Sequence, residues 1–390
     1  MTAEPDWIRM EAAIAPLLAG PGGSPSREPL LAKLADYSSA VVREARMLGA
    51  LAPGSAECDR ALDWLLRPVF ICGHHRCGTT LLQNLLDGHP QLLSLPSEGT
   101  YFSSFAYVAR VTPLERDLNR FAADWVERFV DPNVEPHFRL GRSDAGQNPA
   151  VAFARRLFGW HDALLSRVPR ELAALLALVA AFRATAAPAS APQLWVEKTP
   201  QNERHVERFT ALGAARFIHL VRDPRAVLRS LGAIYRTAGI RRFDAAGYAR
   251  TIGQSLRLAR ENQRRFGSCY LVVRYEDLVD RPSLQMERVQ QFLGLASDAT
   301  LLVPTAGGSA VGANSSFGAG TAGVVEPARP SSALSSEHEA LLEVYAANAA
   351  RQWGYELRTR GTIASYAIRL RHWPRYALRE SRTRLRTAWR

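Results

Sequence analysis

The sequence predicts an α/β fold in which a central parallel sheet is flanked by helices, with further helices before it and a basic tail after it. Three observations support this prediction. Short apolar runs typical of buried strands occur at 67–72, 215–221 and from Cys269 onward. A segment with helical periodicity follows each run. Polar and glycine-containing turns separate each run from its helix, and in such folds ligands bind at the carboxyl ends of the strands.

The chain divides into three predicted parts: a helical segment at 1–65, an α/β domain at 66–357 and a basic amphipathic tail at 358–390. Within the domain, residues 101–187 are mostly helical in pattern and are expected to cover the active face. The other predicted elements, in chain order, are a strand at 67–72, a helix at 79–90, a strand at 194–200, a helix from about 202 to 212, a strand at 215–221, a helix after Pro224, a strand from Cys269, and helices at 281–295 and 335–356.

The net charge of +12 is concentrated in the tail, where residues 358–390 hold ten arginines and one acid. The remaining body is nearly neutral, which argues against nucleic-acid binding. For the tail, the sequence narrowly favours a packed or partly disordered segment over contact with an anionic membrane surface, and a nucleic-acid-binding arm is the least favoured alternative. The longest apolar run, 172–182, is too short to span a bilayer and predicts a buried helix.

The cysteine and histidine content predicts no metal site and no disulfides. The four cysteines lack the paired spacing of a zinc site, and the nine histidines form no ligand motif. The amino terminus carries acidic residues where a secretory leader has a basic start and an apolar centre. We therefore expect a cytoplasmic protein.

The stretch "FICGHHRCGTTLL" at 70–82 predicts a phosphate-binding loop between a strand and a helix. Gly73 and Gly78 have the spacing of the phosphate loop of nucleoside triphosphatases, but Thr79 stands at the lysine position. A helix that begins at Thr79 offers free backbone amides and a partial positive charge to an anion. The alternative is an ordinary glycine turn before a helix.

Four motifs in order resemble the sulfotransferases that use 3′-phosphoadenosine 5′-phosphosulfate: "GHHRCGTTLL", "LPSEGTYF", "WVEKTP" and "FIHLVRDPRAVLRS". The resemblance covers roughly 68–356 and is closest to the bacterial and tyrosylprotein-type branch. It implies a P-loop-like three-layer fold and this donor as co-substrate, without a metal. In the family pattern a proline and a serine stand where this chain has His75 and Cys77.

The resemblance also implies which residues bind the donor. The loop after the first strand would hold the 5′-phosphosulfate, Arg222 and Ser230 the 3′-phosphate, Tyr275 would lie near the adenine, and "NSSFG" at 314–318 would close over the donor. The implied donor-binding residues are His75, Arg76, Cys77, Gly78, Thr79, Thr80, Leu81, Arg222, Ser230, Tyr275, Asn314, Ser315, Ser316 and Phe317. The alternatives are an Arg222–Asp223 ion pair, a surface Ser230 and a packed Tyr275.

Two charged residues are the candidates for catalysis. Lys198, one of only two lysines, ends an apolar strand and would stabilise charge on the bridging oxygen of the donor. The resemblance makes Glu98 the base that takes the proton of the acceptor hydroxyl. The alternatives are an ion pair of Lys198 with Glu197 and a helix-start role for Glu98.

Other residues offer competing chemistry. His137 or His161 could supply the base, and Cys77, at a helix start, could act as a thiolate nucleophile. Residues 304–333, rich in Gly, Ser and Ala, are a ligand flap or a disordered linker.

The predicted function is transfer of a sulfuryl group to a hydroxyl acceptor, which the sequence does not identify further. A kinase with a degenerate phosphate loop and a non-catalytic nucleotide-binding module are the alternatives.

Overall fold

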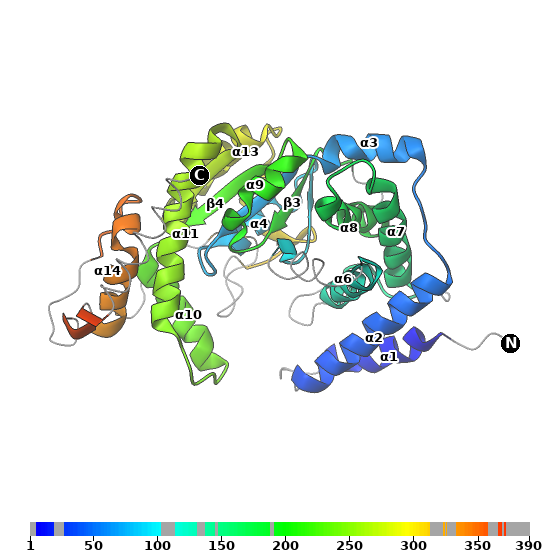
Figure 1. The fold of residues 1–390 in the computed structure, drawn as a ribbon, viewed down its shortest axis with the longest axis horizontal. Helices are drawn as coiled ribbons and strands as arrows, with labels where there is room; N and C mark the ends of the chain where they lie inside the picture. Colours follow the sequence, from blue (N-terminus) through cyan, green and yellow to red (C-terminus); the bar gives the residue numbers. More distant parts are fainter. Residues whose placement is uncertain are drawn as a thin grey trace.

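The protein was analysed as a computed structural model, shown in Figure 1. It describes residues 5–18, 27–102, 114–130, 137–144, 147–187, 191–312, 323, 325, 333–357, 366–368 and 370–371. A central sheet lies between two groups of helices, one containing α10, α11 and α14, the other containing α1–α3 and α6–α8. This arrangement confirms the predicted α/β fold.

The sheet has five strands, all parallel, in the order β2-β3-β1-β4-β5. The strands are β1 (Pro68–Gly73), β2 (Leu92–Ser94), β3 (Leu194–Lys198), β4 (Arg216–Val221) and β5 (Tyr270–Arg274). Strands β1 and β3 are buried along their whole length, as continuous apolar runs predict for a sheet covered on both faces. Edge strand β2, three residues long, is the one that the sequence patterns missed.

Strand β1 lies between β3 and β4. Strands β2 and β3 therefore lie on one side of β1, and β4 and β5 lie on the other. The register pairs Ile71 with Lys198 and Gly73 with Leu220. The carboxyl ends of all three strands therefore lie at one edge. In open parallel sheets this is where ligands bind.

Most of the helices that follow the strands were predicted, but the run from Cys269 to Val279 was expected to be a strand throughout, and its part from Tyr275 onward forms helix α12 (Tyr275–Asp280). The helices after the strands are α4 (Thr79–Leu86), α9 (Val206–Phe209), α10 (Pro224–Thr237), α12 and α13 (Pro282–Leu293). The helix expected at 202–212 is split into three short pieces: the 3₁₀ turn Asn202–Arg204, α9, and the 3₁₀ turn Thr210–Leu212. Asp223 caps α10 by accepting a hydrogen bond from the amide of Arg225 at 2.8 Å.

One long helix, α11 (Ala245–Phe266), was missing from the prediction. It buries Ala249, Ile252, Leu256 and Ala259, which recur at helical spacing, so a periodicity search of this stretch would have found it. The last helix, α14 (Ser336–Arg351), packs against α11. Just beyond it, the Trp353 indole donates a hydrogen bond to the carbonyl of Leu256 at 3.0 Å.

The described part of residues 101–187 contains α6 (Leu114–Phe129), α7 (Pro149–Leu164) and α8 (Arg170–Ala186). Residues 172–182 of α8 are buried throughout, as the apolar run predicts. The N-terminal helices are α1 (Asp6–Leu18), α2 (Arg27–Met47) and α3 (Ser55–Leu65). Trp7, Ile14 and Val41 belong to the same hydrophobic core as strand β1, so the N-terminal segment is part of one packed body.

The region from 304 onward is described only in part. Strands β6 (Thr305–Ala306) and β7 (Ser309–Ala310) form a small hairpin that Asp87 holds through Thr305 and the Gly308 amide. In the tail, Ile368 packs against the core while Tyr366 and Leu370 are exposed. Within the described residues, we find no helix with the length and apolarity needed to cross a membrane.

Candidate active site

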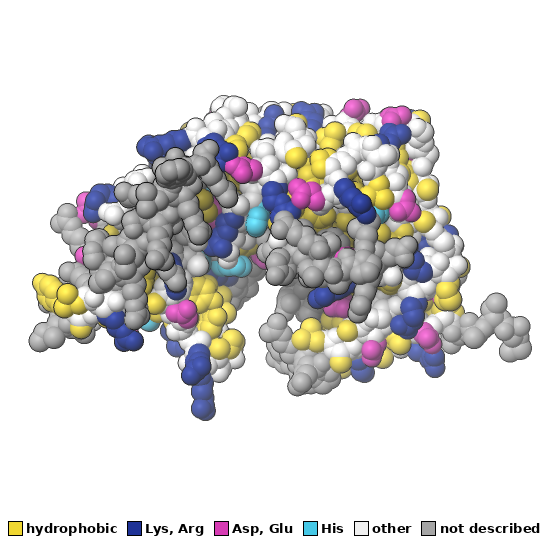
Figure 2. All heavy atoms as spheres, in the orientation of Figure 1, with side chains coloured by type: hydrophobic (Ala, Val, Ile, Leu, Met, Phe, Trp, Pro, Cys, Tyr) yellow, Lys and Arg dark blue, Asp and Glu magenta, His cyan; other side chains and the backbone are white. Residues whose placement is uncertain are grey.

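Every strand of the sheet delivers a candidate residue to the same edge. The glycine loop follows β1, Glu98 lies beyond β2, Lys198 ends β3, Arg222 follows β4 and Tyr275 follows β5. Because the strands are parallel, segments up to about 200 residues apart in the sequence meet at their carboxyl ends. Figure 2 shows the face below the sheet hollowed, with histidine and basic side chains at the upper end of the hollow.

The loop between β1 and α4 has the backbone of a tight anion-binding turn. Gly73, Arg76 and Gly78 all have positive φ, at 130°, 71° and 95°. A Cβ on Gly73 would lie 2.4 Å from the Leu220 carbonyl oxygen, and one on Gly78 would lie 2.3 Å from the Tyr275 ring. Both glycines are therefore required by space as well as by φ. The start of α4 at Thr79 directs its first amides to this loop.

The loop residues implied as donor ligands divide by exposure. His75 and Thr80 are exposed, and Arg76 and Gly78 are half-buried. Cys77, Thr79 and Leu81 are buried, and the Cys77 amide donates to the His74 carbonyl at 3.1 Å, so any contribution of Thr79 and Leu81 to a ligand comes from the backbone. Burial raises the pKa of the Cys77 thiol to about 12, against a thiolate nucleophile.

Arg222 and Ser230 lie against the glycine loop. The Arg76 Nε donates to Ser230 Oγ at 2.9 Å, and Arg222 Nη1 donates to the Arg76 carbonyl at 2.9 Å. Asp223 pairs with Arg225 instead of Arg222, at 2.7 Å. The expected alternatives, an Arg222–Asp223 pair and a surface Ser230 without a partner, are therefore not what the structure has.

The charges of Arg76 and Arg222 are close enough to repel. Burial, and then the charge of Arg222, lower the pKa of the Arg76 guanidinium from its usual value. An anion bound between them would relieve this repulsion, so this donor set fits a phosphate group. Tyr275 is 2% exposed and stacks under Arg222, with 3.9 Å between the guanidinium carbon and the ring centre. This fits the packing alternative for Tyr275.

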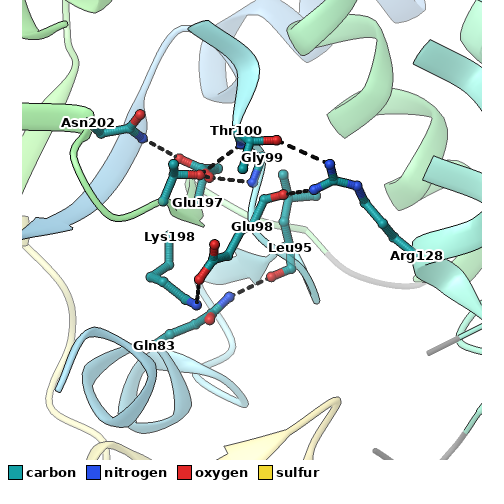
Figure 3. A network of polar contacts seen from close by, with 10 residues as sticks. Gln83, Leu95, Glu98, Gly99, Thr100, Arg128, Glu197, Lys198 and Asn202 are labelled. Atoms are coloured by element: carbon teal, nitrogen blue, oxygen red, sulfur yellow. Dashed lines mark hydrogen bonds and ion pairs between the residues drawn. The ribbon is translucent and has the colours of Figure 1, made fainter. Parts of the chain in front are cut away.

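Glu98 and Lys198, the two candidate catalytic residues, contact each other. Lys198 Nζ donates to Glu98 Oε1 at 2.6 Å (Figure 3). The Lys198 side chain is 9% exposed, and that of Glu98 is 36% exposed. Lys198 thus pairs with Glu98 and not with Glu197, the partner that the alternative named. Residues 98–100 have no regular structure and a π-helical turn is described at 101–102, so the helix-start role of Glu98 stays an alternative.

Glu197, the neighbour of Lys198, is buried beneath the loop that carries Glu98. Its carboxylate accepts hydrogen bonds from the backbone amide of Gly99 at 2.7 Å, from the side-chain amide of Asn202 at 2.7 Å and from the Thr199 hydroxyl. Burial raises the pKa of Glu197 to about 7, although the bonds from Thr199 and Gly99 lower it. Sequence reasoning weighed Glu197 only as an ion-pair partner and missed this role.

A second buried acid, Glu203, lies beneath the glycine loop. Its Oε2 accepts a bond from the Gly73 amide at 3.1 Å, and its Oε1 accepts one from Ser255 Oγ at 2.7 Å. The network continues through His219 to the Tyr270 hydroxyl. Burial lowers the pKa of His219, so its ring is neutral and works as a hydrogen-bonding spacer. No local motif marks these residues, because their partners come from α11, β4 and β5.

The alternative bases are placed differently. His161 is buried in α7, with its Nδ1 3.4 Å from Asp162 of the same helix, and burial lowers its pKa. His137 lies in the segment 137–144 that follows α6. Asn314, Ser315, Ser316 and Phe317 lie outside the described residues. Among the described residues, no group of three or more His, Cys, Asp or Glu side chains is arranged to hold a metal ion.

Comparison with known proteins places this geometry in a family context. A model of the sulfotransferase family matches residues 68–299, which is more than half of the chain. Comparison with curated proteins found no match.

The chain is also similar to solved sulfotransferase structures at low identity. The sulfotransferase domain of the olefin synthase from Synechococcus PCC 7002 is 21% identical, with 75% of this chain and 96% of that chain covered and a TM-score of 0.40. A sulfotransferase from Mycobacterium tuberculosis H37Rv is 16% identical, with 77% and 86% covered and a TM-score of 0.40.

Proposed function

This chain belongs to the sulfotransferase family, and we propose that it transfers a sulfuryl group from 3′-phosphoadenosine 5′-phosphosulfate to an acceptor hydroxyl. The observation that carries this proposal is the contact of Arg222 and Ser230 with Arg76 of the glycine loop. One nucleotide with phosphates at both its 5′ and 3′ positions could therefore contact both groups at the same edge of the sheet. The resemblance to the tyrosylprotein-type branch stays a prediction.

In this proposal the two anionic ends of the donor have separate partners. Arg76 and the backbone amides at the start of α4 bind the 5′-phosphosulfate. Arg222 and the Ser230 hydroxyl bind the 3′-phosphate. Glu203 supports the loop from below by accepting a bond from the Gly73 amide, and the Cys77 amide donates to the His74 carbonyl within the loop.

The transfer is an in-line displacement at sulfur. Glu98 takes the proton of the acceptor hydroxyl, whose oxygen forms a new bond to sulfur while the bond from sulfur to the bridging phosphate oxygen breaks. Lys198 stabilises the charge that develops on the bridging oxygen. The products are a sulfate ester and adenosine 3′,5′-bisphosphate. A sulfuryl group carries less charge than a phosphoryl group, so a few cations suffice without a metal.

The ion pair of Glu98 with Lys198 has a consequence for the order of events. While Lys198 Nζ donates to Glu98 Oε1, that oxygen is occupied and is not free to accept the proton of an acceptor hydroxyl. When the bridging oxygen of the donor draws Lys198 away, Glu98 is released to accept the acceptor proton. Donor binding thereby activates the base, so the donor binds productively before the acceptor.

The acceptor carries a hydroxyl group, and we leave open whether it is a phenol, a sugar, a lipid or a peptide tyrosine. Incubating a cell extract with the enzyme and the donor, and searching for products heavier by one sulfo group, would identify it. The cytoplasmic location and a membrane contact through 358–390 stay predictions.

Lys198→Ala tests the proposal, with Lys33→Ala as its control. Lys33 is the other lysine of the chain and is exposed on α2. With sulfur-labelled donor and a panel of phenols and alcohols, Lys198→Ala should lose transfer by about 10²-fold or more. Binding of adenosine 3′,5′-bisphosphate should be retained in calorimetry, and Lys33→Ala should match the wild type in both measurements.

The same assays separate the alternatives. Transfer of labelled phosphate from ATP that requires Mg²⁺ would favour the kinase. Bisphosphate binding by the wild type without transfer to any acceptor would favour the non-catalytic module. Undiminished transfer by Lys198→Ala would remove Lys198 from the mechanism.

A further inference from the structure

We propose that Arg128 and Glu197 are positioning residues that hold the backbone of residues 98–100 from two sides and thereby place Glu98 against Lys198 (Figure 3). The inference rests on the proposed function, because the placement of Glu98 matters for the reaction only if Glu98 is the base. Neither residue touches the donor or the acceptor in this proposal. Each acts through the loop.

Glu197 holds the loop from the sheet. The Gly99 amide donates to Glu197 Oε1 at 2.7 Å, and the Thr100 amide donates to Thr199 Oγ1 at 2.9 Å. The Thr199 hydroxyl in turn donates to Glu197. Two consecutive loop amides are therefore connected to one buried carboxylate, the Gly99 amide directly and the Thr100 amide through Thr199. A Cβ on Gly99 would lie 2.7 Å from Glu197 Oε1, so only glycine allows this approach.

Arg128 holds the loop from the opposite side. It lies in the last turn of α6, where Nη1 donates to the Glu98 carbonyl and Nη2 donates to Thr100 Oγ1 at 3.1 Å. The planar fork of a guanidinium reaches two acceptors at a fixed spacing, which a lysine ammonium cannot reproduce. Arg128 therefore contacts the residues on both sides of Gly99.

These contacts hold a backbone that local structure does not favour. Thr100 has φ of 45°, in the left-handed region that residues with a Cβ rarely adopt. Such a conformation persists where surrounding contacts determine it. The result is a Glu98 carboxylate 2.6 Å from Lys198. Displacement of a catalytic group by about 1 Å can lower the rate by about 10²-fold, so the position of the Glu98 carboxylate should affect the rate of transfer.

The contacts of Arg128 and Glu197 with residues 98–100, here called the clamp, are connected to helices outside the matched family region. Next to Arg128, Glu127 accepts a hydrogen bond from Ser38 of α2 at 2.8 Å. Arg46 of α2 donates to Asn119 of α6 at 2.7 Å. The N-terminal helices thus support the helix that carries Arg128, which gives them a part in positioning Glu98.

The first test follows the exchange of the loop amides with deuterium, which needs no acceptor. Arg128→Ala and Glu197→Ala should speed exchange in the peptide that contains residues 98–100 by at least about 10-fold, because opening of the loop becomes easier. Arg155→Ala is the matched control, since it removes an arginine of α7 that also donates to two acceptors, the Gly49 and Leu48 carbonyls, without touching α6 or the loop. It should leave exchange at 98–100 unchanged.

The second test measures transfer to the best phenol of the panel. Arg128→Ala should lower kcat by about 10²-fold. The KM for the donor and the affinity for adenosine 3′,5′-bisphosphate should stay as in the wild type. Arg128→Lys should be intermediate, because it can keep one of the two contacts.

A conservative variant tests the Glu197 side. Glu197→Gln keeps an oxygen at the Oε1 position for the Gly99 amide and the Thr199 hydroxyl, and the Asn202 side chain can turn its amide to present Oδ1 to the new NH2 group. Glu197→Gln should therefore keep slow exchange and kcat, whereas Glu197→Ala should lose both. Fast exchange in both variants would overturn the hydrogen-bonding role of Glu197.

The outcomes distinguish the two proposals. If the wild type transfers no sulfuryl group, the proposed function fails, and amide exchange still decides whether Arg128 and Glu197 hold the loop. If transfer occurs and Arg128→Ala behaves like Arg155→Ala in both assays, the positioning role is overturned. A variant that loses bisphosphate binding together with kcat would likewise overturn it, because the clamp acts on the base alone.

Discussion

The two halves of the site are held in place by different means. The donor half, residues 73–81, is shaped mainly by its own backbone, with positive φ at Gly73, Arg76 and Gly78. The base half, residues 95–100, has no regular structure of its own and is held by side chains from β3 and α6. A loop of the first kind is specified by a local motif. A loop of the second kind depends on residues up to about 100 positions away.

In each half, nevertheless, one backbone amide donates a hydrogen bond to a buried glutamate. The Gly73 amide donates to Glu203 at 3.1 Å, and the Gly99 amide donates to Glu197 at 2.7 Å. The two acids differ in what lies beyond them. Glu203 continues into a buried network of Ser255, His219 and Tyr270, whereas Glu197 adjoins Lys198 at the reaction side. Donor binding and base placement should therefore respond to different substitutions.

The largest expected effect comes from Gly78→Ala, which disturbs the backbone of the donor half. The new Cβ would meet the Tyr275 ring at 2.3 Å, at a φ of 95° that strains any residue with a Cβ. Together these costs should weaken binding of adenosine 3′,5′-bisphosphate by on the order of 10³-fold in calorimetry. Gly239→Ala, with φ of 67° and open space around it, is the control and should bind normally. Equal affinity in the two variants would contradict a loop shaped by its backbone.

Gly99→Ala attacks the base half and should have the next largest effect. Its Cβ would lie 2.7 Å from Glu197 Oε1, and φ at this position is not in the left-handed region. Transfer should fall by about 10²-fold in kcat while bisphosphate affinity stays unchanged. Gly54→Ala, with nothing within 4 Å, is the control. A parallel loss of bisphosphate affinity would show that the two halves are coupled.

The smallest expected effect is the pH dependence of stability that Glu197 contributes. Burial raises its pKa from 4.5 to about 7, so folding favours the protonated form. This contribution is fully present below pH 4.5 and is lost as the pH rises through about 7. The free energy of unfolding of the wild type, relative to Glu197→Gln, should therefore fall by on the order of 1 kcal/mol per pH unit between about pH 5 and 7.

Denaturant titrations at several pH values measure this difference, with the exposed Glu207→Gln as a control for the change in net charge. A difference that is flat across this range would mean that Glu197 keeps its charge on folding.

The prediction from the sequence was strongest where the motif and its element coincide. The spacing of Gly73 and Gly78 after an apolar run predicted both strand β1 and helix α4, and the structure confirms both. Strand β2 was missed because three residues are too few to show a period. Helix α11 was missed although its apolar spacing was present in the sequence. The helix at 202–212 was predicted as one element, whereas the chain breaks it into three.

The candidate site follows the same rule. Glu98 and Lys198 could be named from the sequence, but their 2.6 Å contact joins segments 100 residues apart and depends on β2 and β3 being neighbours in the sheet. Arg128, Glu197 and Glu203 carry no local signal, since an arginine near a helix end or an acid beside a strand end is common in any protein. Their importance comes from the backbone amides and carbonyls that they contact.

By itself, the sequence determined the alternation of strands and helices, the glycine turn and the identity of the charged groups, because periodicity and backbone conformation act over a few neighbouring residues. Only the tertiary structure decided the strand order, the contact of Arg222 with the glycine loop and the two buried glutamates beneath the site. Those features arise when segments far apart in the chain are packed at one edge of a sheet. A buried amide or carboxylate there needs a hydrogen-bond partner, because without one the loss of its interactions with water is not compensated.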